Sequence, residues 1–193
     1  MRDQDVRQVV RQRLEAAHAS EADTLVLDEL GLEHGDVRVD IAVINGEIHG
    51  FELKSARDTL ERLPRQVVAY TAALDKATLV VAESHLEKAA ALVPEWWGLS
   101  VARPLEGTTV AVEPRREAVR NPDQQMLSVA RLLWRDEALA ILEEVGAARG
   151  VRTKPRAILY EKLTASLQPD QLRARVRQAL KTRAGWRVAA PRT

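Results

Sequence analysis

Residues 38–54 read RVDIAVINGEIHGFELK, and this stretch decides the fold class. The odd-numbered positions from Val37 to Val43 are all apolar and β-branched, which is the two-residue period of a strand. Asn45-Gly46 is a strong hairpin signal, and the chain then returns as a second strand from Ile48 to Lys54. The stretch therefore predicts two antiparallel strands joined by a tight turn.

Helical and strand patterns alternate on both sides of this hairpin. Apolar residues recur three and four residues apart before it and after it, which is the spacing of a helix face. In chain order, we expect a helix at 5–17, strands at 24–27, 37–44 and 48–54, a helix at 63–75, a strand at 78–82, a helix at 84–93, and strands at 99–102 and 109–112. This order predicts an α/β fold built on one mixed sheet.

The strand signals stop after residue 113, and helical patterns follow. Asn121-Pro122 predicts a helix start, and the apolar face of that helix runs from Met126 to Val145. Two shorter helices are expected at 155–166 and 169–183. The sequence therefore predicts a sheet-containing domain at 1–114 and a basic helical domain at 115–193.

The formal net charge of +1 hides a division between the halves of the chain. Residues 1–114 carry 12 basic and 20 acidic side chains, whereas residues 115–193 carry 17 basic and 8 acidic ones. Such asymmetry suggests a polyanion or an acidic surface as partner. The absence of cysteine excludes disulfides, thiolate zinc sites and thiol nucleophiles. The longest stretch without a charged residue has nine residues, so no membrane span is expected and a cytoplasmic protein is the default.

The residues with the clearest chemical potential lie in the hairpin. Glu52 and Lys54 are two residues apart in one strand and so share a face. A two-residue turn would pair Asp40 with Phe51, on the opposite face from Glu52. A three-residue loop at 44–46 would pair Asp40 with Gly50 and place it diagonal to Glu52, on the same face. We predict the second register, or a bulge of equal effect.

Two carboxylates within a few ångströms repel each other and prefer to share a divalent cation. Oxygen ligands from Asp40 and Glu52, with a backbone carbonyl such as that of Leu53, suit Mg²⁺ or Mn²⁺. Lys54 is then placed to orient a water molecule and to offset the charge of a phosphate. The alternative is that Glu-x-Lys on a strand is a solvated ion pair, which occurs often by chance.

The pattern Asp-x11-Glu-x-Lys across a hairpin, between two helices, resembles the PD-(D/E)xK phosphodiesterase superfamily of restriction-endonuclease-like nucleases. The resemblance covers about residues 25–102, and this wider stretch is similar to a small bacterial group of nuclease-like proteins. It implies a core of a helix, three strands, a helix and a strand. Gln66 and Tyr70 also resemble the Q-x3-Y helix motif of the RecB-like branch, in which these residues order the active site.

This resemblance implies a metal-dependent nuclease that cleaves DNA. Asp40 and Glu52 would hold Mg²⁺ or Mn²⁺, and Lys54 would position the attacking water. Many members add an upstream glutamate as a metal ligand, for which Glu29 is our choice and Glu15 the alternative. Many members also cut two strands as dimers, which leaves a homodimer open.

The predicted helix at 169–183 carries a basic line beside its apolar one. Arg173, Arg177 and Lys181 are four residues apart, so they lie on one helical face and are candidates for contacts with nucleic acid phosphates. The alternative is that these helices dock onto the acidic half or onto a second subunit. The competing functional hypotheses are a catalytically silent nuclease-fold protein that binds DNA, and an interaction subunit of a repair or defence complex.

Overall fold

The computed structural model describes residues 2–105 and 110–183. Its centre is a six-stranded sheet whose strands lie side by side in chain order. The strands are β1 (Leu25–Leu32), β2 (Val37–Ile44), β3 (Ile48–Lys54), β4 (Lys76–Ala82), β5 (Gly98–Pro104) and β6 (Val110–Arg116). The predicted mixed α/β sheet followed by helices is therefore confirmed; Thr109, where the last strand was expected to begin, lies outside the described residues.

The directions of the strands explain where the helices lie. The β1–β2, β2–β3 and β5–β6 pairs are antiparallel, whereas β3–β4 and β4–β5 are parallel. Each parallel neighbour needs a crossover connection. These crossovers contain α2 (Leu63–Ala73) and, after the 3₁₀ turn η2 (Glu83–His85), the short helix α3 (Leu86–Ala90).

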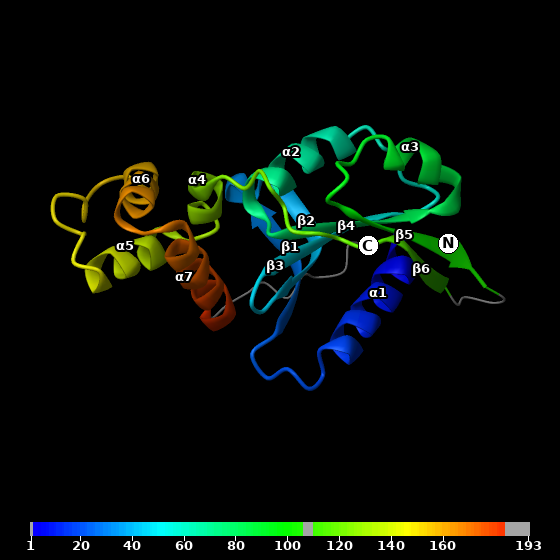
Figure 1. Ribbon diagram of the computed structural model, residues 1–193, viewed down its shortest axis with the longest axis horizontal. Helices are drawn as coiled ribbons and strands as arrows, with labels where there is room; N and C mark the ends of the chain where they lie inside the picture. Colours follow the sequence, from blue (N-terminus) through cyan, green and yellow to red (C-terminus); the bar gives the residue numbers. More distant parts are fainter. Residues whose placement is uncertain (1, 106–109, 184–193) are drawn as a thin grey trace.

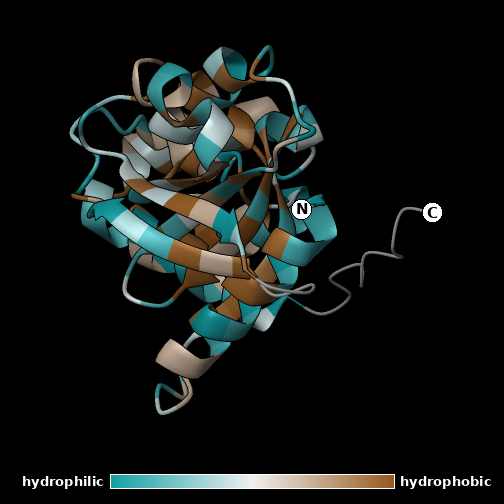
Figure 2. Ribbon diagram, turned by 90° about the vertical axis from the view of Figure 1, so that its right-hand side faces the viewer, coloured by the Kyte–Doolittle hydropathy of each residue, from teal (hydrophilic) through white to brown (hydrophobic). Residues whose placement is uncertain are grey.

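Helices cover both faces of the sheet (Figure 1). On one face α1 (Asp3–Ala17) packs Val6 and Val10 against sheet residues that include Leu53 and Val80. On the other face, under α2, Trp97 is fully buried and its ring stacks on Tyr70 at 5.2 Å between centroids. Figure 2 shows hydrophobic residues along the strands and hydrophilic ones on outward helix surfaces. The apolar periodicity of the sequence thus corresponds to two distinct cores.

The C-terminal helices are α4 (Met126–Ala130), α5 (Arg135–Glu144), α6 (Arg156–Ser166) and α7 (Pro169–Thr182). The single helix expected from 122 to 145 was wrong, because the first helix begins only at Met126 and the chain breaks between α4 and α5. Trp134 has extended backbone angles there, and its N–H donates to Glu137 Oε2 at 2.7 Å. This N-terminal cap starts a new helix and turns the chain.

Asn121 also differs from its predicted role as a helix cap for the following segment. Its side chain is buried, and its amide nitrogen donates to the carbonyls of Thr71 and Leu74 at 2.7 and 2.8 Å. Its side-chain oxygen accepts from the N–H of Asp123 at 2.9 Å. Asn121 therefore closes the C-terminal end of α2 and fixes the path of the chain between the sheet and the helices.

One hydrophobic cluster runs through both halves of the molecule. It includes Leu79 of the sheet, Tyr160 of α6 and Leu172 of α7, all fully buried. The 3₁₀ turn η1 (Glu33–Gly35) also contacts the helices, since Glu33 forms an ion pair with Arg131 at 2.6 Å. The division into domains at 114 and 115 stays a prediction. Among the described helices, none has the length and apolar character needed to cross a membrane.

Candidate functional site

The register of the β2–β3 hairpin brings Asp40 and Glu52 to one face of the sheet. Ala42 pairs with Gly50 and Ile44 with Ile48, so the loop is Asn45–Glu47, three residues as predicted but one position later. The side chain of Asn45 closes this loop by accepting from the N–H of Glu47 at 3.2 Å. Compared with the predicted register, the strand pairing is shifted by one residue on each strand. Asp40 therefore lies directly opposite Glu52 and not diagonal to it.

Glu52 is surrounded by the other residues that the motif singled out. Its carboxylate is 1% exposed and accepts from Lys54 Nζ at 2.6 Å, Gln66 Nε2 at 2.6 Å and Tyr70 Oη at 2.5 Å. Lys54 Nζ also donates to Gln66 Oε1 at 3.1 Å. Strand β3 supplies the ion pair and α2 supplies the two hydrogen-bonding side chains one turn apart. The structure therefore gathers all four residues into one buried network.

Burial raises the pKa of Glu52 to about 7, and the negative charge of Asp40 acts in the same direction. The ammonium group of Lys54 opposes this shift without cancelling it. Burial and the adjacent Glu52 also raise the pKa of Tyr70 above its ordinary value. Tyr70 is therefore a hydrogen-bond donor to Glu52 at neutral pH.

Asp40 has a different cation, which sequence analysis missed. Arg7 of α1 donates to Asp40 Oδ1 at 2.7 Å and to the Asp40 carbonyl at 2.8 Å. The other carboxylate oxygen of Asp40 accepts from the N–H of Leu53 at 2.8 Å. Arg7 also lies 3.6 Å from carboxylates of Asp3 and Glu29. The signal was in the sequence: Arg7 sits beside Val6 on the helical face that packs on the sheet.

Glu29 lies on β1, opposite Asp40 in the ladder. Its φ is +58°, a left-handed conformation that a glutamate rarely adopts, and the backbone pairing is interrupted there. Its carboxylate is 3.6 Å from Arg7 and 3.4 Å from Arg38. Glu15, the alternative metal ligand, instead pairs with Arg11 at 2.9 Å and does not line the cleft described below.

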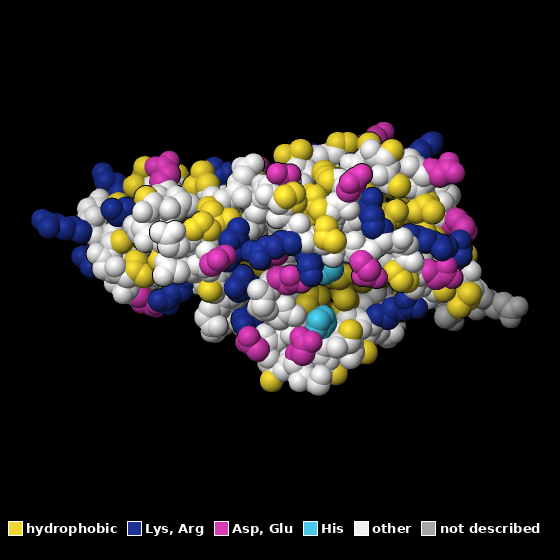
Figure 3. Space-filling view, viewed as in Figure 1, with side chains coloured by type: hydrophobic (Ala, Val, Ile, Leu, Met, Phe, Trp, Pro, Cys, Tyr) yellow, Lys and Arg dark blue, Asp and Glu magenta, His cyan; other side chains and the backbone are white. Residues whose placement is uncertain are grey.

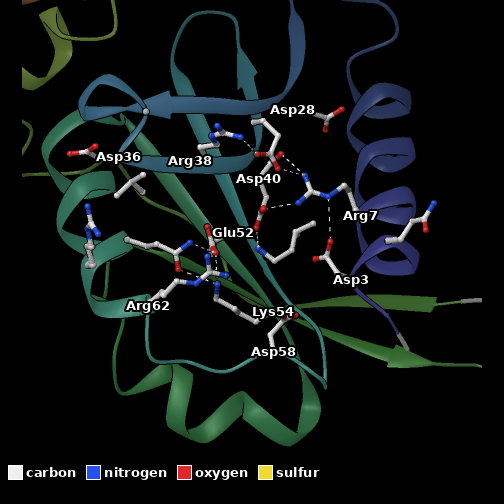
Figure 4. Close-up of a pocket in the computed structure, with 17 residues that line it drawn as sticks. Asp3, Arg7, Asp28, Asp36, Arg38, Asp40, Glu52, Lys54, Asp58 and Arg62 are labelled. Carbon is white, nitrogen blue, oxygen red and sulfur yellow. Dashed lines mark hydrogen bonds and ion pairs between the residues drawn. The ribbon is translucent and has the colours of Figure 1, made fainter. Parts of the chain in front are cut away.

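These residues line a cleft of about 620 Å³ between α1, α2 and the end of the β1–β2–β3 edge (Figure 4). Its floor contains the paired Asp40, Glu52 and Lys54. The lining also includes the acidic residues Asp3, Asp28, Glu29, Asp36 and Asp58 and the basic residues Arg38, Arg62 and Arg65. Arg62 and Arg65, at the start of α2, are exposed, and their side chains form no hydrogen bond or ion pair within the described residues.

The arrangement does not fit a resident divalent cation. Both oxygens of Asp40 and both oxygens of Glu52 already accept hydrogen bonds, and each carboxylate has its own cation. No group of three or more His, Asp or Glu side chains in the described part of the chain is arranged to hold a metal ion. A divalent ion would have to displace Lys54 and Arg7 before it could use these oxygens.

Two residues of the predicted basic line on α7 hold the two halves of the chain together. Arg173 donates to Gln124 Oε1 at 2.6 Å and to Asp170 at 2.8 Å, and lies 3.9 Å from Asp75. Lys181 donates to Asp23 at 2.6 Å. The docking alternative therefore describes the contacts of these two side chains. The side chain of Arg177 forms no hydrogen bond or ion pair within the described residues, and contact of all three with nucleic acid stays a prediction.

A family model described as "Bacteriophage P4 protein cII" matches residues 1–187. The chain belongs to the bacteriophage P4 protein cII family. Protein cII of Enterobacteria phage P4 is 33% identical to it over 61 residues, which make up 32% of this chain and 23% of that relative. No solved structure matches the chain.

Membership of the cII family shows that the assignment to the PD-(D/E)xK superfamily was wrong. That assignment rested on a short motif within 25–102, whereas the cII family model spans nearly the whole chain. The predicted metal-dependent nuclease, a hydrolase of DNA, is wrong for the same reason, and the silent nuclease-fold alternative loses its basis. The physical reason for the false signal is visible in the cleft. Glu52 and Lys54 form a buried ion pair at 2.6 Å, which produces the same Glu-x-Lys spacing as a nuclease motif.

Proposed function

We propose that this cII-family chain is a binding protein whose cleft holds a phosphate group of a nucleic acid, without cleaving it. The observation that carries the proposal is the contrast between the floor and the mouth of the cleft. The floor cations, Lys54 and Arg7, are saturated by carboxylates. The mouth cations, Arg62 and Arg65, are exposed and, among the described residues, form no ion pair.

Unpaired guanidinium groups favour a phosphate because they donate hydrogen bonds in a fixed fork that matches its oxygens. The N-terminal end of α2, where Arg62 and Arg65 lie, adds a favourable electrostatic contribution. The acidic wall fits the other part of a nucleotide. Exocyclic amino groups of bases are donors, and Asp36 and Asp58 of the lining offer carboxylate acceptors. A nucleotide unit therefore complements both signs of charge in the cleft.

Fluorescence anisotropy with a labelled single-stranded oligonucleotide tests this proposal. Replacing Arg62 and Arg65 with alanine should weaken binding about tenfold. The slope of the logarithm of the binding constant against the logarithm of salt concentration should become less steep by about 1.4, as expected for two lost phosphate contacts to a single strand. The matched control replaces Lys88 and Arg120, which are also exposed but do not line the cleft. Equal binding by the wild type and the cleft variant would reject the proposal.

Binding of Mg²⁺ or Mn²⁺ by Asp40, Glu52 and Glu29 stays a prediction, and the paired carboxylates argue against it. Calorimetric titration with Mn²⁺ tests it directly. A binding heat that is lost in Asp40→Asn would support the metal site. No heat in the wild type would reject it and leave the phosphate proposal unchanged. The predicted cytoplasmic location and homodimer also stay predictions.

A further inference from the structure

The connection between α5 and α6 concentrates positive charge at one end of the molecule. We call residues 145–156 the distal loop, with Arg156 as the first residue of α6. It contains Arg149, Arg152, Lys154 and Arg156, and the sequence has no acidic residue from Val145 to Tyr160. Lys and Arg side chains form the far left tip of the space-filling view, where Figure 1 places this loop (Figure 3).

Most cations elsewhere in the helical half are used within the protein. Arg131, Arg173, Arg175, Lys181 and Arg183 form ion pairs with Glu33, Asp170, Glu144, Asp23 and Glu137, respectively. In the distal loop only Arg152 does so, with Glu143 at 2.9 Å. The side chains of the other three basic residues of the loop are exposed and form no hydrogen bond or ion pair within the described residues. Their charge therefore does not serve the docking of the two halves.

An exposed indole lies beside this loop. Trp134 at the start of α5 is 53% exposed, although the guanidinium of Arg183 lies 4.4 Å from its ring centre. The neighbouring Arg135 donates to the backbone carbonyls of Arg152 and Lys154 at 2.6 and 3.4 Å. These hydrogen bonds hold the distal loop close to Trp134, because Arg135 is the next residue in the chain. Cations next to an exposed aromatic ring combine phosphate attraction with a stacking surface for a base.

The distal loop is linked to the cleft through the turn η1. His34 of this turn stacks on Tyr160 of α6 at 5.8 Å, and the next residues, Gly35 and Asp36, line the cleft. Arg156 is close enough to His34 to contribute to the lowering of the pKa of that histidine, after the larger effect of burial. A strand that leaves the cleft past η1 therefore reaches the first cation of α6 next.

We propose that the distal loop, through Arg149, Lys154 and Arg156, is a second phosphate-binding surface for the strand held in the cleft, with Trp134 as a base-stacking platform. The ligand is then a polynucleotide and not a mononucleotide. This inference rests on the proposed function of the cleft, and it assigns the contacts to a part of the helical half different from the line on α7. An acidic protein surface would use the same charge, so the test below includes a polyanion without bases.

The test compares a short oligonucleotide of about 5 nucleotides with one of about 30, because only the longer can reach both surfaces. Replacing Arg149, Lys154 and Arg156 together with alanine should leave the short ligand unaffected. For the long ligand, affinity should fall at least about tenfold. The slope of the logarithm of its binding constant against the logarithm of salt concentration should become less steep by about 2, as expected for three lost contacts to a single strand. The matched control replaces the exposed residues Lys88, Arg115 and Arg120.

Unchanged affinity of this distal-loop variant for the long oligonucleotide would overturn the inference, even if the Arg62 and Arg65 variant loses binding. If the distal-loop variant loses affinity for the long oligonucleotide while the Arg62 and Arg65 variant binds normally, the proposed function of the cleft is rejected and the distal loop remains a phosphate-binding surface. In a Trp186→Phe background, Trp134→Leu should remove fluorescence quenching by the long ligand while the buried Trp96 and Trp97 stay unquenched. Competition by polyglutamate as strong as that of an oligonucleotide of equal charge would also overturn it, in favour of an acidic protein partner.

Discussion

Two titratable side chains, the buried Glu52 and the half-buried His49, influence stability in opposite directions over the same pH range. The pKa of Glu52 is raised from 4.5 to about 7 by burial and by Asp40, so the folded protein retains a proton that the unfolded chain releases. Its contribution is complete below pH 4.5 and is lost as the pH rises through about 7. Burial and the nearby Lys76 lower the pKa of His49 from 6.5 to about 4, so its contribution is complete above pH 6.5 and is lost on acidification.

Variants that keep only one of the two side chains should therefore show opposite slopes of the free energy of unfolding against pH. In Glu52→Gln with Lys54→Gln, only the contribution of His49 remains, and the free energy of unfolding should rise between about pH 5 and 7. In His49→Gln it should fall over the same range. Each change between pH 5 and 7 should be about 2 kcal/mol, since one pKa unit corresponds to about 1.4 kcal/mol. Urea unfolding at a series of pH values measures both slopes, and parallel curves for the two variants would contradict the assignment.

Glu29 stores backbone strain at the wall of the cleft. A left-handed glutamate costs about 1 kcal/mol or more, and such strain is often retained where a side chain serves a function. Glycine adopts this conformation freely, whereas glutamine keeps both the strain and the shape of the side chain. We expect Glu29→Gly to be more stable than Glu29→Gln by about 1 kcal/mol in thermal unfolding. The opposite order, which is normal for glycine in a strand, would show that the position is unstrained.

At the level of elements, local pattern predicted the strands of the hairpin to the residue. Val37–Ile44 and Ile48–Lys54 have alternating apolar positions and a strong turn signal, so their bounds needed no tertiary information. The break between α4 and α5 could not be predicted, because the apolar spacing continues through Arg131–Trp134 and only the cap at Trp134 ends the helix. For the network around Glu52, the strand pattern singled out Asp40, Glu52 and Lys54, and the resemblance to the Q-x3-Y motif singled out Gln66 and Tyr70. Both missed Arg7, whose partner is 33 residues away in sequence.

The contacts of α7 distinguish residues that join the halves from residues that do not. The Arg173 side chain is 17% exposed; it binds Gln124 and Asp170 within the C-terminal half and lies 3.9 Å from the buried Asp75 of the other half. Arg173→Ala should lower the free energy of unfolding by about 1–3 kcal/mol, because it leaves buried polar groups without a partner. Arg177→Ala, on the same helix, should change it by less than about 0.5 kcal/mol. Chemical denaturation of both variants checks this, and equal losses would mean that helix propensity and not docking explains the effect.

At the level of the whole molecule, the division of charge is partly explained by contacts between the halves. Lys181 pairs with Asp23, and Arg131 pairs with Glu33, in each case a base of the C-terminal half with an acid of the N-terminal half. These pairs are partly exposed and contribute little each. They orient the docking, whereas the stabilisation comes from the apolar cluster that includes Leu79, Tyr160 and Leu172.

Because that cluster is continuous, the two halves should unfold together. Leu172 is fully buried in α7, and Leu172→Ala should remove about 2–5 kcal/mol of stability through lost burial and the cavity left behind. Fluorescence of the buried Trp96 and Trp97, in a Trp134→Phe, Trp186→Phe background, reports on the sheet half, and far-ultraviolet circular dichroism is dominated by the helices. In urea both signals should shift to the same lower midpoint, although the substitution lies in the helical half alone. A fluorescence midpoint that stays in place while the dichroism midpoint falls would mean that the cluster is two cores in contact, and that 1–114 folds independently, in line with the domain boundary predicted from the end of the strand signals.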